Sequence, residues 1–290
     1  MWTPIAEEAE QAARVLHPHG QAMPRPAQRR ILTVANQKGG VGKTTSAVNL
    51  AAALTSYGMR VLVIDLDPQG NASTALGVEH TSGTASVYEA LLGEISLAEA
   101  AVSSTQSPDL LCVPATIDLA GAEIELVSLV AREARLKQAL NEAVLDELDV
   151  DYVLVDCPPS LGLLTVNALV AAAEVLIPIQ CEYYALEGLG QLLSNIELVR
   201  AHLNRTLHVS TILLTMYDGR TKLADQVTNE VRKHFGGRVL RTVIPRSVKV
   251  SEAPGFGQTV LAYDPGSRGA RSYLDAAREM VAQQDAMARR

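Results

Sequence analysis

The sequence feature that most constrains the fold is a glycine-rich turn that joins an apolar strand to a helix. Residues 31–35 form a short apolar run typical of a buried strand. The turn Asn36-Gln37-Lys38-Gly39-Gly40-Val41-Gly42 follows, and a helix is expected to begin at about Lys43. Its three glycines let the backbone fold tightly, so that N–H groups of the turn and of the helix start can point at one bound anion. The turn therefore predicts a phosphate-binding site on a strand–turn–helix unit.

The chain beyond this turn predicts an α/β protein with a doubly wound, mainly parallel sheet flanked by helices. Short apolar runs alternate with longer amphipathic stretches, which is typical of βαβ units. The predicted strands are Ile31–Ala35, Val61–Asp65, Leu110–Val113, Tyr152–Asp156, Val175–Ile179, Val209–Leu214 and Val239–Val243. The predicted helices are Lys43–Tyr57, Gly121–Leu148, Leu163–Ala173, Leu186–His202, Lys222–Phe235 and Ser267–Gln284.

The first 29 residues differ in composition from the rest of the chain. Met1–Arg29 is rich in Ala, Pro and charged residues and predicts a flexible extension, in which a short helix over Ile5–Leu16 is conceivable. The length and a hydrophobic content of 48% suit one large α/β domain or two small ones. Because the pattern of strands and helices begins at Ile31 and continues along the chain, we expect an extension at residues 1–29 and one domain at residues 30–290.

The residues after the glycines match most of the P-loop pattern G-x-x-x-x-G-K-[ST], although Gln37 replaces its first glycine. In this pattern Lys43 reaches the β- and γ-phosphates of a nucleotide, and the hydroxyl of Thr44 ligates Mg²⁺. Thr45 is expected to contact the α-phosphate. A glycine-rich turn without a ligand is the alternative, and Lys-Thr-Thr at this spacing argues against it.

Three aspartates stand at predicted strand ends. Asp65 and Asp67 end the run from Val61, and Pro68 is expected to stop that strand so that the two carboxylates diverge. Asp156 ends a second apolar strand and precedes Cys-Pro-Pro. One strand-end aspartate is as consistent with a helix cap as with a site, but three beside a phosphate loop predict a cation site. We expect Asp156 to hold Mg²⁺ through a water molecule.

Charge is unevenly distributed along the chain. The net charge is −7, yet residues 200–290 carry 15 Lys and Arg against 8 Asp and Glu, whereas residues 1–199 carry 10 against 24. Such asymmetry fits either a solvated basic surface or a nucleic-acid-binding face on an acidic protein. An aromatic content of only 4% disfavours a single-strand binder that stacks bases.

Cysteine use and hydropathy exclude several classes of protein. Cys112, Cys157 and Cys181 form no C-x-x-C pair, which disfavours structural zinc, an iron–sulfur cluster and a disulfide framework and fits a reducing cytosol. No apolar run reaches the length of a membrane span, and Met1–Gln28 lacks the apolar stretch of a signal peptide.

Lys38 narrows the class further. The stretch Lys38-Gly-Gly-Val-Gly-Lys-Thr-Thr45 resembles the deviant Walker A motif K-G-G-x-G-K-[ST] of the family that includes ParA, MinD, nitrogenase iron protein and arsenite-transport ATPases. From Arg30 to Arg290 the chain is most similar to chromosomal, Soj-like ParA proteins. The blocks that carry this similarity are Asn36–Lys38, Asp65–Ala72, Asp156–Ser160, Leu214–Asp218, Ile244–Arg246, Ser251–Pro254 and Tyr263–Ala270. The three cysteines do not resemble the cluster ligands of nitrogenase iron protein, and Met280–Arg290 lacks the bulky apolar residues of a MinD-type lipid anchor.

The resemblance implies an ATP hydrolase that uses ATP and Mg²⁺. Two subunits are expected to sandwich two ATP molecules, with Lys38 crossing to the nucleotide of the partner. Asp67 is expected to position the attacking water, so that the implied catalytic residues are Lys38, Lys43 and Asp67. The metal shell is expected to include Thr44, Asp65 and Asp156. The implied nucleotide contacts are Lys38, Gly39, Gly40, Val41, Gly42, Lys43, Thr44, Thr45, Met216, Pro245 and Arg246.

The resemblance also implies partners and a cellular role. The ATP-bound homodimer is expected to bind double-stranded DNA without sequence preference, and a ParB-like centromere-binding protein is expected to stimulate hydrolysis. The DNA-binding candidates are Arg220, Lys222, Lys249, Arg268 and Arg271. Arg246 either joins this set or holds the nucleotide base. We expect DNA partitioning, without membrane binding, in the cytoplasm on the nucleoid. The alternative is a ParA-like ATPase that positions a non-DNA cargo or regulates replication initiation; a nucleotide switch without turnover is disfavoured by Asp67 and Asp156.

Overall fold

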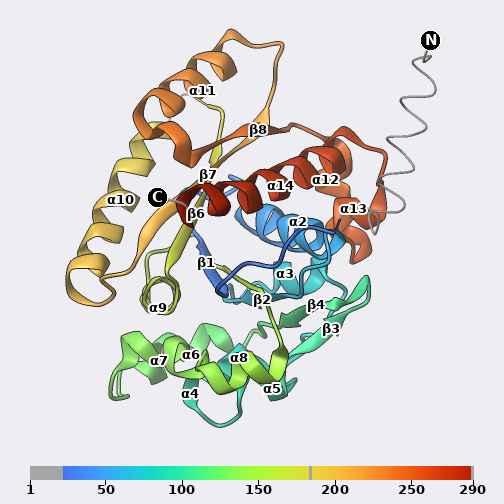
Figure 1. The fold of residues 1–290 in the computed structure, drawn as a ribbon. Helices are drawn as coiled ribbons and strands as arrows, with labels where there is room; N and C mark the ends of the chain where they lie inside the picture. The colour runs from blue at the N-terminus through green and yellow to red at the C-terminus, as the bar shows by residue number, and fades with distance from the viewer. Residues whose placement is uncertain (1–21, 183–184, 289–290) are drawn as a thin grey trace.

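A central, mostly parallel sheet organises the chain (Figure 1). The computed structural model describes residues 22–182 and 185–288, and its sheet has the strand order β3-β4-β2-β5-β1-β6-β7-β8. Only β3 and β4 pair antiparallel. The strands are β1 Arg30–Val34, β2 Val61–Asp65, β3 Val102–Ser104, β4 Ser107–Val113, β5 Tyr152–Asp156, β6 Glu174–Gln180, β7 His208–Tyr217 and β8 Val239–Pro245.

Helices cover both faces of the sheet (Figure 1). One face packs against α2, α13 and α14, and the other against α4–α9 and, farther along the sheet, α10 and α11. The helices are α2 Lys43–Ser56, α3 Asn71–Ala75, α4 Val87–Leu92, α5 Leu97–Ala100, α6 Leu119–Leu126, α7 Arg135–Ala139, α8 Glu142–Leu148, α9 Leu163–Ala171, α10 Ala185–His202, α11 Lys222–Phe235, α12 Val248–Glu252, α13 Val260–Tyr263 and α14 Arg268–Ala288. Short 3₁₀ turns are η2 Arg132–Ala134, η3 Gly236–Arg238 and η4 Ala253–Phe256.

The inner strands are apolar on both faces because both faces are covered. In β2 every residue is buried; Val61 and Val63 pack toward α2 and α14, whereas Leu62 and Ile64 pack toward α4–α8. Successive strand side chains point to opposite faces, so a continuous apolar run is what a strand between two helical layers requires. This confirms the predicted fold class, a doubly wound α/β sheet flanked by helices.

The predicted continuous helix over Gly121–Leu148 is wrong. The segment breaks into α6, η2, α7 and α8, with Ala131 in the left-handed conformation at φ 54°. Asn167 of α9 stabilises the break, since its side chain accepts a hydrogen bond from the N–H of Leu136 and donates one to the carbonyl of Arg132. Asn141 then caps α8 through the N–H of Val144. The apolar residues follow a curved path over the sheet that one straight helix does not match.

The predicted strands all occur, with ends shifted by up to three residues, but the edge strand β3 was not predicted. Its three residues are Val-Ser-Ser, and two of them are exposed, so they carry no apolar periodicity. The predicted helix at Ile5–Leu16 lies outside the described residues, and the domain boundary at residue 30 stays a prediction.

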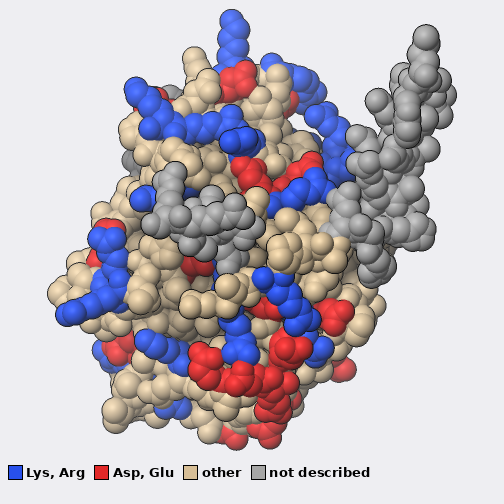
Figure 2. Space-filling model, viewed as in Figure 1, with Lys and Arg blue, Asp and Glu red and all other residues tan. Residues whose placement is uncertain are grey.

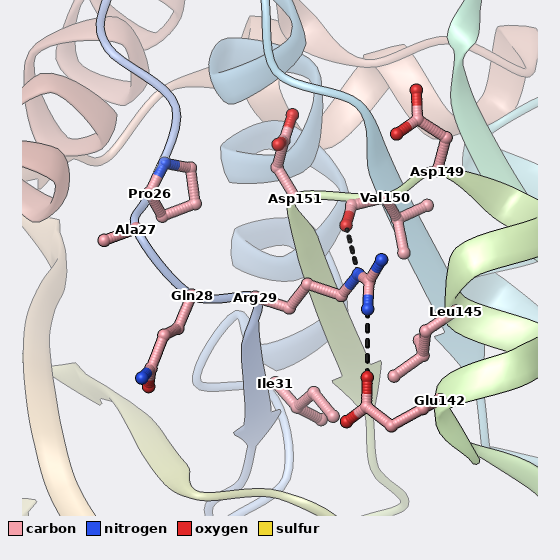
Figure 3. Close-up of a pocket in the computed structure, with 10 residues that line it drawn as sticks. All are labelled: Pro26, Ala27, Gln28, Arg29, Ile31, Glu142, Leu145, Asp149, Val150 and Asp151. Carbon is pink, nitrogen blue, oxygen red and sulfur yellow. Dashed lines mark hydrogen bonds and ion pairs between the residues drawn. The ribbon is translucent and has the colours of Figure 1, made fainter.

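Charged residues just before β1 bind the amino edge of the sheet (Figure 3). The Arg29 guanidinium donates to the carbonyl of Val150 at 3.2 Å and pairs with Glu142 and Asp146 of α8. Arg25 lies 3.6 Å from Asp151. A cavity of about 520 Å³ opens here, lined by Pro26, Ala27, Gln28, Arg29, Ile31, Glu142, Leu145, Asp149, Val150 and Asp151. Its charged groups already have partners in the chain, which indicates a structural clasp and not a catalytic site.

A buried ion pair lies beside this clasp. Arg30 donates to both carboxylate oxygens of Glu174, at 2.7 and 2.5 Å, and to the carbonyl of Met280 in α14 at 3.2 Å. Both side chains are nearly inaccessible, with exposures of 10% and 13%. Burial alone raises the pKa of the Glu174 carboxyl, but the Arg30 guanidinium outweighs it and holds that pKa below the usual range. The pair thus ties β1, β6 and α14 together.

We expect Arg30→Met to destabilise the protein by about 3–5 kcal/mol, because it leaves the Glu174 carboxylate buried without a partner. Arg29→Met is the matched control and should cost about 1 kcal/mol, because its carboxylate partners are exposed. Since the folded pKa of Glu174 is depressed, the contribution of the pair is present above pH 4.5 and is lost as the pH falls further. Urea denaturation measures the free energy of unfolding of both variants. Equal losses of stability would contradict the role of Arg30 and Glu174 as a buried stabilising pair.

Candidate nucleotide-binding site

The glycine turn forms an open cradle at the carboxyl end of β1. Gly40 and Gly42 adopt left-handed φ angles of 73° and 85°, which residues with side chains rarely adopt. Val41 is buried, and its carbonyl accepts a hydrogen bond from Thr215 of β7 at 2.8 Å. Asn36 fixes the entrance, since its side chain bonds the N–H of Lys38 and the carbonyl of Pro178. The turn is therefore held from two neighbouring strands.

The amino end of α2 presents unsatisfied backbone N–H groups to this cradle. Gly42 is its N-cap, no side chain caps the helix, and its first turn contains no acidic residue. Free N–H groups and the helix dipole favour a bound anion at such a position. Thr44 and Thr45 stand in the first turn, where the sequence predicts contacts to Mg²⁺ and to the α-phosphate.

The two lysines of the turn point to different places. Lys43 is buried, and its Nζ lies 3.4 Å from the carbonyl of Lys38, inside the cradle. Burial lowers the pKa of Lys43, and the Asp156 carboxylate opposes that shift. Lys38 instead places its Nζ 3.5 Å from the carboxylate of Glu182. The side chain of Lys38 thus stays outside the cradle, as the sequence predicts.

The carboxylates of β2 and β5 meet beside Lys43. Asp65 and Asp156 are register partners on neighbouring parallel strands, and both are fully buried. Asp65 accepts hydrogen bonds from the N–H and hydroxyl of Ser73 and from the N–H of Asp67, whereas neither oxygen of Asp156 has a hydrogen-bond partner. Burial raises the pKa of Asp65 to about 6 and raises that of Asp156, which the Asp65 charge raises further.

Buried carboxylate oxygens without a hydrogen-bond partner suit a cation ligand. Asp156 fits the predicted role of a magnesium ligand, whereas the oxygens of Asp65, which was also expected in the metal shell, already accept hydrogen bonds from Ser73 and from the N–H of Asp67. No group of three or more His, Cys, Asp or Glu side chains suited to a metal occurs in the part of the chain that the structure describes. A magnesium ion here would need Thr44, phosphate oxygens and water as its other ligands, which is the usual arrangement for Mg²⁺ in nucleotide sites.

Asp67 follows β2 in a tight turn that aims its carboxylate toward the cradle region. Its Oδ1 accepts from the N–H of Gln69 at 3.1 Å, and its carbonyl accepts from the N–H of Gly70 at 2.9 Å. Gly70 has a φ of 64°, and a Cβ there would lie 2.5 Å from His80, so this position requires glycine. The negative charge of Asp67 acts on Lys43 and Asp156, which shows that the three groups are close.

A cavity of about 240 Å³ extends the cradle toward β7 and β8. It is lined by Gly42, Thr45, Thr215, Met216, Ile244, Pro245, Arg246, Ser247, Val250, Ser251 and Tyr273. The structure therefore brings three of the predicted nucleotide contacts next to the phosphate turn, namely Met216, Pro245 and Arg246. Met216 has a φ of 50°, an uncommon value for a residue with a side chain, and such outliers gather at ligand sites.

Of the predicted DNA-binding residues, Arg220 lies in the loop after β7, and Lys249 lies on α12, just after β8. The N–H of Arg246 bonds the carbonyl of Tyr217, which brings the loop after β8 beside the loop after β7. In Figure 2 Lys and Arg predominate over the upper part of the molecule, where α11 and β8 lie in Figure 1, whereas Asp and Glu gather toward the bottom, with Lys and Arg also scattered over the lower half. Lys222 and Arg268 begin α11 and α14, and Arg271 lies one turn farther into α14.

Two of these cations have acidic neighbours. The Arg220 guanidinium contacts Asp218 at 2.7 and 2.9 Å and lowers the pKa of that carboxyl to about 2. Lys249 lies 3.3 Å from Glu252 and 5.4 Å from the centre of the Tyr263 ring. Such exposed pairs exchange partners at little cost, so a phosphate group could replace the carboxylates. Asp218 and Glu252 were not predicted as carboxylates that compete with DNA phosphates for Arg220 and Lys249, although both stand within three residues of these cations.

Ser73 and Glu182 are further residues of the site that the sequence analysis missed. Ser73 stands on the short helix α3, and its signal was only its place eight residues after Asp65. Glu182 follows β6, which neighbours β1 in the sheet, so the strand order was needed to bring it to Lys38.

Comparisons with known proteins agree with this site. The AAA domain family matches residues 29–209. The chain is 53% identical over 253 residues to the sporulation initiation inhibitor protein Soj of Bacillus subtilis, covering 87% of this chain and 98% of the relative. It is 52% identical over 255 residues to the chromosome partitioning protein ParA of Caulobacter vibrioides, covering 88% and 95%. A crystal structure described as cobyrinic acid a,c-diamide synthase of Mycobacterium smegmatis with ADP and magnesium is 41% identical, with a TM-score of 0.74 over 87% of this chain and 93% of that one.

The fold and the cradle define a P-loop nucleotide-binding protein of the ATPase class. Within that class, the chain belongs to the Soj/ParA family of chromosome-partitioning proteins. No helix in the described ranges is long and apolar enough to cross a membrane.

We expect Asp156→Asn to stabilise the magnesium-free protein by about 1–3 kcal/mol, because it removes a buried carboxylate whose oxygens have no hydrogen-bond partner. The folded pKa of Asp156 is raised, so its ionisation opposes folding as the pH rises, and the gain should be larger at pH 8 than at pH 5. The same variant should lose the effect of Mg²⁺ on nucleotide binding. Thermal unfolding with and without chelator measures both.

The exposed variant Asp109→Asn is the matched control, since Asp109 pairs with Arg60 away from the site. An Asp156→Asn protein that is less stable without magnesium would contradict the role that we assign to this carboxylate.

Proposed function

We propose that this protein is an ATP hydrolase that partitions DNA as an ATP-dependent sandwich dimer. The observation that carries the proposal is the shared edge of the sheet: the phosphate cradle, the unpaired Asp156 and the basic loops after β7 and β8 all lie at the carboxyl ends of the strands. Relatives of about 50% identity include proteins named chromosome partitioning protein ParA, which supports this role over that of the diamide synthase named at 41% identity.

The chain's own residues explain how Mg-ATP would be held. The N–H groups at the start of α2 and the ammonium group of Lys43 would hold the phosphates, and Thr44 and Asp156 would hold the metal. Bound magnesium neutralises charge on the β- and γ-phosphates. Met216, Pro245 and Arg246 would line the base, and Asp67 would orient the water that attacks the γ-phosphate.

The dimer would complete each site. Lys38 lies outside its own cradle, which leaves its charge available for a partner's nucleotide. A ParB-like partner would stimulate a slow intrinsic reaction, since P-loop enzymes often await a stimulating group. The protein would act in the cytoplasm on the nucleoid, where dimers bind DNA through phosphate contacts without reading bases.

A packed route connects the nucleotide to the basic loops. Ser73 of α3 holds Asp65, α3 packs against η4, and η4 continues α12, which carries Lys249. Gln106 of the β3–β4 turn locks this contact, since its side chain donates to the carbonyl of Ala75 at 3.0 Å and accepts from the N–H of Thr259 at 3.0 Å. Movement of α3 on nucleotide binding would therefore reach the proposed DNA surface.

We expect Asp67→Ala to bind Mg-ATP and to stay on DNA after free ATP is washed away. The substitution removes the carboxylate that orients water but leaves Lys43 and Thr44 unchanged, so hydrolysis slows and binding persists. A DNA-retention assay measures it against wild type and Asp118→Ala, an aspartate in a loop outside the site. Dissociation as fast as in wild type would move the catalytic role to another residue, with Asp65 the next candidate.

We expect Arg220→Glu and Lys249→Glu to weaken binding to all DNA sequences alike without affecting ATP-driven dimerisation. Each lost phosphate contact should flatten the slope of log affinity against log salt by about 0.9, and a dimer loses two. Arg200→Glu is the control, because Arg200 ends α10 and pairs with Glu197. Filter binding across a salt series decides; variants that match wild type, or a nucleotide-free monomer that binds DNA equally tightly, would contradict the proposal.

A further inference from the structure

The carboxylate of Glu182 links two cations of the nucleotide site. One of its oxygens lies 3.5 Å from Nζ of Lys38, and the other lies 3.5 Å from a guanidinium nitrogen of Arg246. Lys38 belongs to the phosphate turn and Arg246 to the base cavity, so one anion pairs with residues from both ends of the site. Neither contact was predicted from the sequence.

Local backbone structure fixes Glu182 in this place. The N–H of Glu182 bonds the carbonyl of Gln180 at 2.8 Å, and the Gln180 side chain donates to the Glu182 carboxylate at 2.5 Å. The N–H of Cys181 bonds the carbonyl of Thr215 on β7. Because β6 pairs with β1, the turn after β6 lies beside the phosphate turn that follows β1. The carboxylate is thus presented to Lys38 by the sheet itself.

We propose that Glu182 is a positioning residue that holds Lys38 within its own subunit and so opposes dimerisation until ATP is bound. The inference rests on the proposed function, in which Lys38 crosses to the partner's nucleotide. A lysine paired with a carboxylate of its own chain must leave that partner before it can reach another subunit. The triphosphate of the partner supplies more negative charge than one carboxylate, so the exchange becomes favourable only when ATP is present.

The size of the effect follows from the exposure of the pair. The side chains of Lys38 and Glu182 are 36% and 45% exposed, so the pair is of the weak surface kind. A pair of this kind typically changes an equilibrium constant by about threefold per protomer. Formation of one dimer breaks two pairs, and we therefore expect Glu182→Gln to tighten the dimer by about tenfold.

The test compares dimer dissociation constants by analytical ultracentrifugation, with a saturating non-hydrolysable ATP analogue and Mg²⁺. Glu197→Gln is the matched control, since it removes one exposed carboxylate from an ion pair with Arg200 on α10. We expect Glu182→Gln to dimerise about tenfold more tightly than wild type and Glu197→Gln to match wild type. The tightening should persist in an Arg246→Gln background, because it acts through Lys38.

A second readout addresses the free monomer directly. In nucleotide-free protein with ¹⁵N-labelled lysine, the ammonium group of Lys38 should become more mobile by NMR in Glu182→Gln and not in Glu197→Gln. Two outcomes would overturn this inference alone, provided that the wild type dimerises. One is an unchanged mobility of the Lys38 ammonium group in Glu182→Gln, and the other is a dimer dissociation constant of Glu182→Gln that is equal to or higher than that of the wild type. If neither wild type nor any variant dimerises with the analogue, the sandwich dimer itself is wrong, and both proposals fall together.

Discussion

The structure depends on two carboxylates that parallel strand pairing forces together. Asp65 and Asp156 end β2 and β5 in register, in a layer from which helices on both faces exclude water. Burial raises the pKa of both carboxyls, and the Asp65 charge raises the pKa of Asp156 further. Ser73 and the backbone of Asp67 satisfy Asp65, whereas Asp156 has no hydrogen-bond partner. One carboxylate is therefore committed to the structure and the other is left for a cation.

The amino edge of the sheet carries charged residues that stabilise the fold, and the carboxyl edge carries those of the proposed site. At the amino edge Arg30 and Glu174 satisfy each other, and Arg29 binds α8. At the carboxyl edge Lys43 lies inside the phosphate cradle, and Arg220 forms an exposed ion pair with Asp218 that another anion can replace. Parallel strands make this division possible. Their carboxyl ends lie at one edge of the sheet, where the helices that follow begin, and helix N-termini attract anions. An acidic chain can thus hold a polyanionic ligand at one edge.

The sequence pattern predicted those strands and helices whose bounds depend mainly on the residues within them. Strands β2 and β5 and helix α11 were predicted with their observed bounds, since continuous apolar runs and a strong amphipathic period decide them. The broken helix over 121–148 was not predictable, because Asn167 stabilises the break from a distant helix. The same limit applies to the site: motif spacing identified Lys43 and Asp156, whereas Glu182 reaches Lys38 only through the neighbouring order of β1 and β6.

Such long-range contacts also suggest how nucleotide binding at the phosphate cradle could move the surface that carries Lys249. Helix α3 has only five residues and depends on its neighbours for position. One neighbour is Asp65, the register partner of Asp156, and the other is η4, which continues the helix that carries Lys249. Gln106 bonds both α3 and the segment after η4, so the two cannot separate without breaking partly buried hydrogen bonds. We therefore expect a shift of α3 to move η4 with it, because a closely packed interior does not absorb such a shift.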